Sequence, residues 1–569
     1  MDLPSTDTGL TGVYNPLARR DGSLSYLIAQ PPALAAAATE LAGIGSALSE
    51  ATAAAAAPTA AIATAAADEV STAIAQLFGA FGQEFQAINA QLGALYNEFT
   101  LKLTAAANAY FGDDAISAAR LVRGATTGLI TPTSPPVVPP VFNQNTALVM
   151  SGTGSPIPSL QYITNITNLF LPPGVIVSPL NTIEELYPIT GVKSLPFQNS
   201  VETGLQILDT AIWQEINAGN HVTVFGYSQS AVISSLEIQQ LLSLGPNKPD
   251  PSQLSFIFIG NEMNPNGGIL SRIPGLNIST LGLPFYGATP DNPYPTTTYT
   301  LEYDGFADFP RYPLNILSDI NAVFGILTVH TQYPNLTPEQ IANATLLPTQ
   351  GVTSNQYFII ETPDLPLLAP VRAIPVIGPP LAALVQPNLE VIVNLGYGDP
   401  NFGYSTSPAN IPTPFGLFPD IPLSVVVDAL VAGTHQGIND FAAALPAALN
   451  PPELPIIGFP PYIEQILPPA PSPIPATPSN ITDVLAAVVS DAYSLLLPTA
   501  DLGLAFATIL PVFDLSLFLN QLLQGNLRAA IELPLAATFG LAALGGMIEF
   551  IAIVRTVAEI VQQLQSLSF

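Results

Sequence analysis

The sequence predicts an α/β protein in which a mostly parallel sheet carries helices on both faces. Between residues 146 and 400, short β-branched and aromatic runs alternate with apolar runs at helical spacing, the order typical of such a sheet. Within this region Ser228 stands between a strand-like run and a helix-like run. An alanine-rich segment precedes the region and apolar, proline-rich segments follow it, so we expect helical regions on both sides.

The composition indicates a folded protein and excludes several classes of function. The chain has 569 residues, enough for roughly two to four domains. It is 48% apolar and 9% charged, which is not the composition of a disordered chain. Twelve Lys and Arg against 41 Asp and Glu argue against binding to nucleic acids or to anionic lipid. The absence of cysteine excludes disulfides and Cys-ligated zinc, and three histidines leave little room for a metal site, so we expect no cofactor.

Five segments follow from these changes in composition. They are an N-terminal extension (1–23), a helical hairpin (24–123), a Pro-rich linker (124–145), the α/β domain (146–400) and an apolar helical C-terminal region forming a lid or extra layer (401–569).

The hairpin segment has a seam that needs helical partners. A first helix is expected from residue 30 to about 50, and after a break at Pro58 and Thr59 a long second helix is expected to about 109. Apolar residues of the second helix recur every three or four positions from Val70 to Phe99, which is nearly a coiled-coil pattern. Two helices cannot bury so long a seam alone, so we expect a partner's helices to cover it. The alternative is a hairpin that lies on the downstream domain.

Residues 24–115 resemble the PE domain of mycobacteria. The resemblance rests on residues 30–37 (Gln-Pro-Pro-Ala-Leu-Ala-Ala-Ala), 43–48, 54–58 and 65–71. It departs at Pro32, where the family usually has Glu, and in the leading 23 residues, which suggest a start near Leu24. Those residues do not have the apolar run of a signal peptide. The resemblance implies a PPE-type helical partner and type VII secretion to the cell surface or envelope, with Tyr110 and Asp114 as the Tyr-x-x-x-acid signal.

Beyond the linker, the expected elements of the α/β domain can be placed in order. Strands are expected at 147–150, 222–225, 254–259 and 299–303, and helices at 201–216, 231–242 and 320–329. After residue 400, proline-rich loops (451–478) lead to apolar helices (481–567). The stretch 533–554 is long enough to cross a membrane, but Pro534 and Glu549 favour a buried or peripheral helix.

Residues 226–230 (Gly-Tyr-Ser-Gln-Ser) have the pattern of a nucleophile elbow, in which a sharp turn exposes a serine hydroxyl above a sheet. The pattern ends in Ser230 where Gly is usual. A serine needs a histidine base that is oriented by a carboxylate, and in α/β-hydrolases the chain order is serine, acid, histidine. His221 lies on the elbow strand itself, too close in sequence to reach Ser228. We therefore favour His330 over His435 as the base.

The acid and the oxyanion donors are expected in loops that follow strands. Asp308 is favoured as the acid, because it has the Gly-x-x-Asp-x-Pro spacing common in these folds, and Asp304 is the alternative. The backbone N–H of Gln229, next to the nucleophile, is one expected oxyanion donor. The backbone N–H of Thr153, with its hydroxyl, is the other. The alternative for residues 151–154 is a Gly-rich turn without chemistry.

Together these segments resemble the PE-PPE domain, a cutinase-like serine hydrolase of mycobacteria. The resemblance spans about 145–400 and rests on residues 151–154, 226–230, 260–261 with 266–268, and 303–310, and on His330 with nearby Tyr333. Thr331 departs from a usual Gly. It implies an esterase or lipase that acts on acyl esters through an acyl-enzyme. Some members are thought to be acyltransferases that build trehalose lipids, which is the first alternative. A non-enzymatic envelope or channel protein is the second.

Overall fold

The computed structural model describes residues 142–192, 194–449 and 471–568. The expected hairpin, most of the linker, the start near Leu24 and the signal residues Tyr110 and Asp114 lie outside the described residues.

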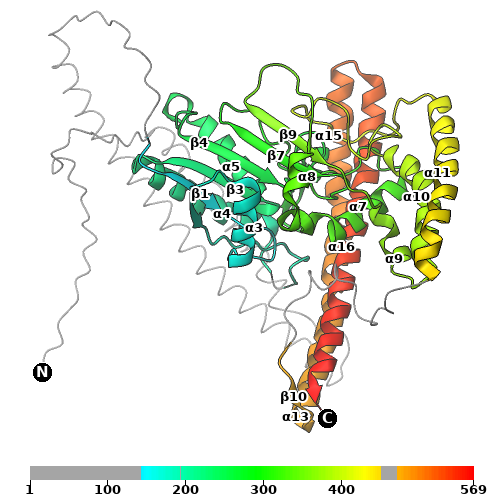
Figure 1. Ribbon diagram of the computed structural model, residues 1–569. Coiled ribbons are helices and arrows are strands. Elements are labelled where there is room, and N and C mark those ends of the chain that lie inside the picture. Colours follow the sequence, from blue (N-terminus) through cyan, green and yellow to red (C-terminus); the bar gives the residue numbers. More distant parts are fainter. Residues whose placement is uncertain (1–141, 193, 450–470, 569) are drawn as a thin grey trace, which may run out of the picture. The chain divides into compact units, whose positions relative to one another are not determined.

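A seven-stranded sheet forms the centre of the described chain (Figure 1). In spatial order its strands are β2 (Ile176–Pro179), β1 (Asn145–Val149), β3 (His221–Tyr227), β4 (Leu254–Ile259), β7 (Thr296–Leu301), β9 (Asn355–Ile360) and β8 (Thr345–Leu346). Every neighbouring pair is parallel except the antiparallel pair β8–β9 at one edge. The sheet therefore has the mostly parallel form that the alternation of elements predicts. Two short pairs lie outside it, β5 (Asn277–Ile278) with β6 (Leu283–Pro284) and β10 (Ile474–Pro475) with β11 (Leu567–Ser568).

Both faces of the sheet are buried by helices. On one face, Leu148, Val224 and Phe258 share a core with α4 (Phe197–Asn217) and α5 (Gln229–Ser243). On the other face, Val149 and Phe225 share a second core with α3 (Leu160–Phe170) and with the 3-10 helix η2 (His330–Asn335). Burial on both faces agrees with the mostly parallel form of the sheet.

The main difference from the expected elements concerns β7. The strand was expected at 299–303 but runs from Thr296 to Leu301. A run of β-branched threonines extends it at the start, and Tyr303 has a φ of 65°, which a strand cannot accommodate. The chain therefore turns earlier than expected, which decides where the following acidic residues lie.

The C-terminal helices pack in pairs and join the core of the sheet. α10 (Gly378–Asn394) packs on α11 (Leu423–Leu449), and α15 (Leu510–Leu523) packs on α16 (Leu527–Ser566), as Figure 1 shows. α13 (Pro478–Ser494) and α14 (Leu496–Leu504) precede α15, and α16 also contacts α7 (Ile316–Thr328). Leu541, Leu544 and Ile548 of α16 belong to the same buried cluster as the strands, so this helix is part of the α/β core.

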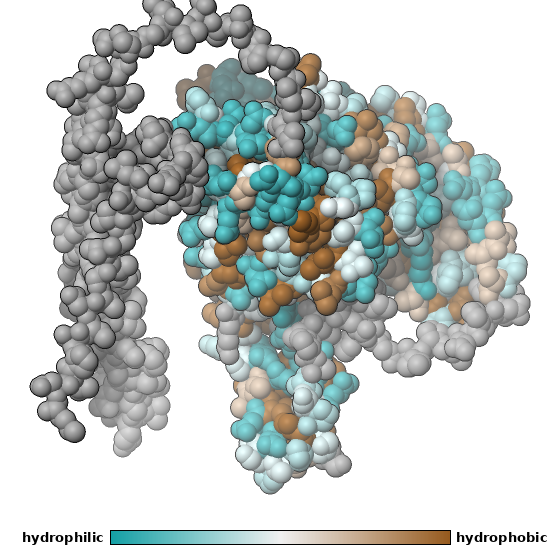
Figure 2. Space-filling model, turned by 60° about the vertical axis from the view of Figure 1, so that its left-hand side comes forward, coloured by the Kyte–Doolittle hydropathy of each residue, from teal (hydrophilic) through white to brown (hydrophobic). Residues whose placement is uncertain are grey.

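Two helical stretches have the length and hydropathy of a membrane span, Pro478–Leu523 and Leu527–Ser566. Half of the most apolar window in the second stretch is buried, as in a core helix of a soluble protein, against 17% in the first. Figure 2 shows exposed apolar side chains as patches among polar ones on the visible face.

Candidate active site

Ser228 lies on a strained turn between β3 and α5. Its φ is 57°, in the region that non-glycine residues rarely occupy. Gly226 makes the turn possible, because a Cβ there would lie 2.8 Å from the Cα of Ala231. Ser230, in the position where the pattern usually has Gly, accepts a hydrogen bond from the N–H of Tyr227 at 2.8 Å. The substitution therefore adds a contact that ties the elbow together.

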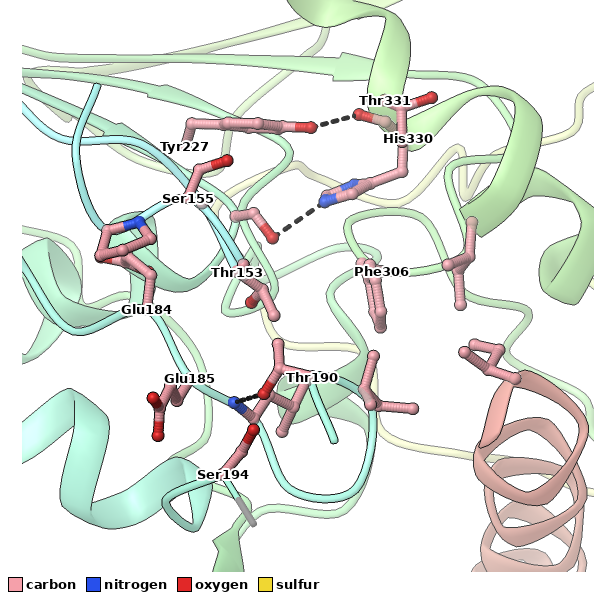
Figure 3. A pocket seen from close by; sticks show the side chains of 18 of the residues that line it. Thr153, Ser155, Glu184, Glu185, Thr190, Ser194, Tyr227, Phe306, His330 and Thr331 are labelled. Atoms are coloured by element: carbon pink, nitrogen blue, oxygen red, sulfur yellow. Dashed lines mark hydrogen bonds between the residues drawn. The ribbon is translucent and has the colours of Figure 1, made fainter. Parts of the chain in front are cut away.

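The His330 ring lies within hydrogen-bond distance of the serine. His330 is the first residue of η2, which follows α7, and its Nε2 lies 2.9 Å from Ser228 Oγ. The ring of Tyr227 stacks on the imidazole with centroids 5.4 Å apart, and Phe306 meets it edge-on at 4.8 Å. The Tyr227 hydroxyl also donates to the His330 carbonyl at 2.9 Å (Figure 3). These contacts hold the imidazole in one orientation.

Asp304 is the carboxylate beside the histidine. Its Oδ1 and Oδ2 lie 2.8 and 2.9 Å from His330 Nδ1. The Tyr333 hydroxyl donates to Oδ2 at 2.7 Å, and the N–H of Phe306 donates to Oδ1 at 3.0 Å. Burial raises the pKa of Tyr333 well above its usual range, so this hydroxyl stays protonated and remains a donor. The fully buried Asp304 is thus satisfied by several donors.

The preference for Asp308 as the carboxylate beside His330 is corrected by this geometry. Asp308 Oδ2 instead accepts from the backbone N–H of Tyr303 at 3.1 Å. Burial raises the pKa of Asp308, and that N–H together with the Arg272 charge opposes the increase. The early end of β7 is the physical reason: it places Asp304 at the carboxyl edge of the sheet, and Asp308 falls one helical turn further, inside the loop.

The expected oxyanion residues lie together beside Ser228. Thr153 follows β1, and its hydroxyl donates to the Gln229 side-chain oxygen at 3.0 Å. Gln229 in turn donates to Ser200 at 2.6 Å. Gly152 brings the loop close, since a Cβ there would lie 3.0 Å from Ser228 Cβ. Within the described part of the chain, no acceptor takes the backbone N–H of Thr153, and that of Gln229 opens α5, where helical N–H groups lack partners.

Two buried glutamates at the site were not among the expected residues. Glu262 Oε1 accepts from Ser228 Oγ at 3.2 Å, and burial raises the pKa of Glu262 to about 7. Glu184 lines the same cavity as the serine, and burial raises its pKa to about 8. In the sequence, Glu262 could have been noticed as an acidic residue three positions after the end of β4. Glu184 carried no comparable signal.

The two other histidines lie elsewhere. His221 begins β3, where its ring meets Phe142 edge-on at 5.4 Å. His435 is exposed on α11. Of the three histidines, His330 is the one that the structure brings to the elbow.

A cavity of about 430 Å³ opens over Ser228 and His330. Figure 3 shows Thr153, Phe306 and His330 around this cavity, with α16 on one side. Ile551 and Arg555 of α16 belong to its lining. Across residues 142–192, 194–449 and 471–568, no three His, Cys, Asp or Glu side chains are grouped so as to hold a metal ion. The arrangement places a serine hydroxyl, an imidazole and a carboxylate in one hydrogen-bonded series, the set of groups on which acyl transfer through a serine depends.

Two family models match the sequence. The PE family matches residues 27–117, and the PE-PPE domain matches residues 173–398. The PE-PPE match falls within residues 145–400, which resemble that domain by motif, and the PE match covers nearly the same residues as the resemblance at 24–115.

Relatives from Mycobacterium tuberculosis (strain ATCC 25618 / H37Rv) cover most of the chain. The uncharacterized PPE family protein PPE28 is 47% identical, covering 73% of this chain and 67% of its own. Esterase PE16 is also 47% identical, over 70% of this chain and 73% of its own. A more distant relative, SL1278 acyltransferase Chp1, is 30% identical over 37% of this chain and 51% of its own. Among solved structures, a cutinase-like protein from Cryptococcus sp. matches 29% of this chain and 79% of its own, with 18% identity and a TM-score of 0.19.

Proposed function

Because this chain belongs to the PE family of mycobacterial proteins and carries a PE-PPE domain, we propose that it is a serine hydrolase that cleaves acyl esters. The observation that carries the proposal is the hydrogen-bonded series from Ser228 through His330 to Asp304. The 47% identity to Esterase PE16 supports the same class of reaction.

In the first step His330 acts as the base. With its Nδ1–H donated to Asp304, its Nε2 carries a lone pair toward Ser228 Oγ. As Oγ attacks the ester carbonyl, the serine proton passes to Nε2, and the imidazolium that forms is stabilised by the Asp304 carboxylate. The imidazolium then returns the proton to the leaving alcohol, and an acyl-enzyme remains on Ser228.

The tetrahedral oxyanion would be held by two backbone N–H groups. Those of Gln229 and Thr153 flank the serine and are free to donate. The Thr153 hydroxyl is engaged with the Gln229 side chain, so we assign its contribution to holding the loop rather than to the oxyanion. In the second step a water attacks the acyl carbonyl while His330 takes its proton. The ester bond to Ser228 then breaks, the imidazolium returns the proton to Oγ, and the acid product leaves.

A fluorophosphonate probe tests the nucleophile directly, because it modifies only an activated serine. We expect the wild-type protein to be labelled and Ser228→Ala to be unlabelled. Ser234→Ala is the matched control. Ser234 is a buried serine of α5, the helix that follows Ser228, and its hydroxyl donates to the Ser230 carbonyl. Equal labelling of wild type and Ser228→Ala would refute the assignment. Absence of labelling in the folded wild type would favour a non-enzymatic envelope or channel protein.

Acyl transfer to a sugar is the second candidate, favoured by the relationship to SL1278 acyltransferase Chp1. The same acyl-enzyme would form, and a sugar hydroxyl would take the place of water in the second step. Supplying a trehalose lipid together with a chromogenic ester separates the two, because a hydrolase releases free acid whereas a transferase gives an acylated sugar.

The PE region suggests a partner and a route of export. We assign residues 24–123 to pairing with a PPE-type protein, and Tyr110 with Asp114 to a type VII secretion signal that directs the chain to the cell surface or envelope. Export of Tyr110→Ala and Asp114→Ala variants from a mycobacterial host tests this assignment: both should stay in the cells, and normal export of both would remove it.

A further inference from the structure

A groove of about 410 Å³ lies between α7 and α16, two helices that are in contact (Figure 1). Within the described chain, this groove and the cavity over Ser228 have no lining residue in common. The volume is in the range of small-molecule sites, which are mostly apolar with a few polar groups that orient the ligand. The groove has this composition, because its lining is apolar except for Asp319.

Small residues on α16 keep the groove open. Ala542, Ala543 and Gly546 line it, and a Cβ at Gly546 would meet no atom within 4 Å. Packing therefore does not require a glycine there, although glycine is a poor helix former. The part of α16 that lines the groove runs from Phe539 to Phe550, which is about 16 Å at 1.5 Å per residue. The groove is therefore long enough for an elongated molecule.

Asp319 is the polar side chain of this lining. It is 7% exposed, and within the described part of the chain its Oδ1 has no hydrogen-bond partner. A buried carboxyl oxygen without a partner is costly, and native structures rarely leave one unsatisfied. None of the described residues that line the groove is basic. A ligand that brings a hydrogen-bond donor to Asp319 would remove this cost.

A cation suits this carboxyl better than an anion does. Asp319 lies in the first turn of α7, where the helix dipole favours negative charge. Burial raises the pKa of Asp319 to about 8, and no neighbouring charge of the described residues takes part in that shift. In the free protein the carboxyl therefore holds its proton at neutral pH. An ammonium group beside it would favour the carboxylate form and release that proton.

The aromatic residues of the groove also favour a cation. Phe324, Phe539 and Phe550 belong to its lining, and the rings of Phe324 and Phe550 meet with centroids 6.3 Å apart. The faces of aromatic rings attract cations, and their bodies provide apolar contact area. The lining thus offers contacts to both parts of an apolar molecule that carries one positive charge.

We infer that the groove between α7 and α16 is a second ligand site, which binds an elongated apolar molecule with one ammonium group. The ammonium group lies at Asp319, and the apolar part follows α16 past Gly546. This site is independent of the proposed hydrolase reaction, because it contains neither Ser228 nor His330.

The test is titration calorimetry of the full chain with dodecylamine, and with dodecanoate as the anion of equal chain length. Gly546→Phe should abolish the binding of dodecylamine in the groove, because the phenyl ring fills the open space. Gly503→Phe is the matched control, since a Cβ at Gly503 also meets nothing within 4 Å and Gly503 does not line the groove. It should bind dodecylamine as the wild type does. Dodecanoate should show no binding that Gly546→Phe removes.

Asp319→Asn tests the role of the charge. It should weaken dodecylamine binding by about tenfold or more, because it removes a hydrogen bond between charged groups. Titrations at pH 7 in two buffers of different ionisation enthalpy should show that the wild type releases about one proton for each dodecylamine bound and that Asp319→Asn releases none. A merely structural role of Asp319 would not change this proton release.

Three results would overturn the inference. They are equal affinity of the wild type and Asp319→Asn for dodecylamine, binding that survives Gly546→Phe, and a dimer of the wild type that Gly546→Phe converts to a monomer, since the groove would then hold a second copy of the chain. Ester hydrolysis is not part of the measurement, so failure of the proposed hydrolase reaction would leave the result unchanged.

Discussion

Asp304 and Asp308 are four residues apart and equally buried, yet their surroundings assign them different tasks. Asp304 accepts from the imidazole of His330, from the Tyr333 hydroxyl and from the Phe306 N–H. Asp308 accepts from a backbone N–H in its own loop and lies beside the Arg272 charge. One carboxylate therefore contacts the imidazole, and the other contacts the backbone of its own loop.

Replacing each of the two carboxylates by its amide should separate these tasks. Asp304→Asn would offer an amide where the imidazole N–H needs an acceptor, so we expect kcat to fall by about 10³–10⁴. Asp308→Asn should lower the free energy of unfolding by about 1–3 kcal/mol, with less than about a tenfold effect on kcat per titrated serine. Kinetics and thermal unfolding of both variants check this. A larger kcat loss in Asp308→Asn would reverse the assignment.

Glu262 should give the activity a dependence on pH. The Ser228 hydroxyl has one proton and two neighbouring acceptors, His330 Nε2 and Glu262 Oε1. Because burial raises the pKa of Glu262 to about 7, this carboxyl is neutral below that pH and leaves the proton to His330. Above it, the carboxylate competes for the proton and disfavours a nearby oxyanion.

We therefore expect kcat to decline as the pH rises through about 7, and Glu262→Gln to remove that decline. Glu237→Gln is the control, because Glu237 is also a buried glutamate on the same side of the sheet, with a pKa raised by burial to about 8. Its profile should match the wild type. The role of Glu262 would be disproved by a Glu262→Gln profile that still declines near the same pH.

At the scale of elements, the sequence predicted well those features that depend on the local pattern of residues. The strand–serine–helix order located the elbow, because close packing restricts the flanking residues to small types. β4 begins and ends where its β-branched and aromatic run does. The end of β7 was misplaced, since a positive φ at Tyr303 is set by tertiary contacts and leaves no pattern in the residues before it.

The site was predictable to the extent that chain order constrains it. Ser228 and His330 followed from a motif and from the small number of histidines. Asp304 and Asp308 are separated by one helical turn, and the spacing of residues in the sequence cannot decide which of the two lies beside His330. Glu262 could be noticed as an acidic residue just after β4, but its contact with Ser228, 34 positions away in the chain, could not, and neither could the approach of α16 to the cavity.

The close packing of strand and helix at the elbow predicts that one added methyl group destabilises the fold. Gly226→Ala would place a Cβ 2.8–3.0 Å from the backbone of Ser230 and Ala231, so strand and helix must separate. We expect a loss of about 1–3 kcal/mol in unfolding free energy, and slower fluorophosphonate labelling of Ser228. Gly503→Ala in α14 is the control: nothing lies within 4 Å, and the change should stabilise the helix by up to about 1 kcal/mol. Equal stability of the two variants would contradict close packing at the elbow.

At the scale of the molecule, buried carboxyl groups should make the fold less stable as the pH rises. Burial raises the pKa of Glu262 and Glu302 to about 7, and of Glu184, Glu237 and Asp319 to about 8. In the unfolded chain these groups ionise near their ordinary values of about 4–4.5. Their folded pKa values are raised, so the stability they contribute is fully present below about pH 4 and is lost as the pH rises toward 8.

The formal charge of −29 adds repulsion that salt screens, whereas the cost of ionising a buried carboxyl is screened little. We therefore expect the thermal midpoint to be several degrees lower at pH 8.5 than at pH 5.5, and added salt to restore only part of the difference. Glu237→Gln should reduce the difference, because it removes one buried group that ionises in this range. A midpoint that rises with pH would contradict the expected loss, and a difference that salt abolishes would mean that surface charge alone causes it.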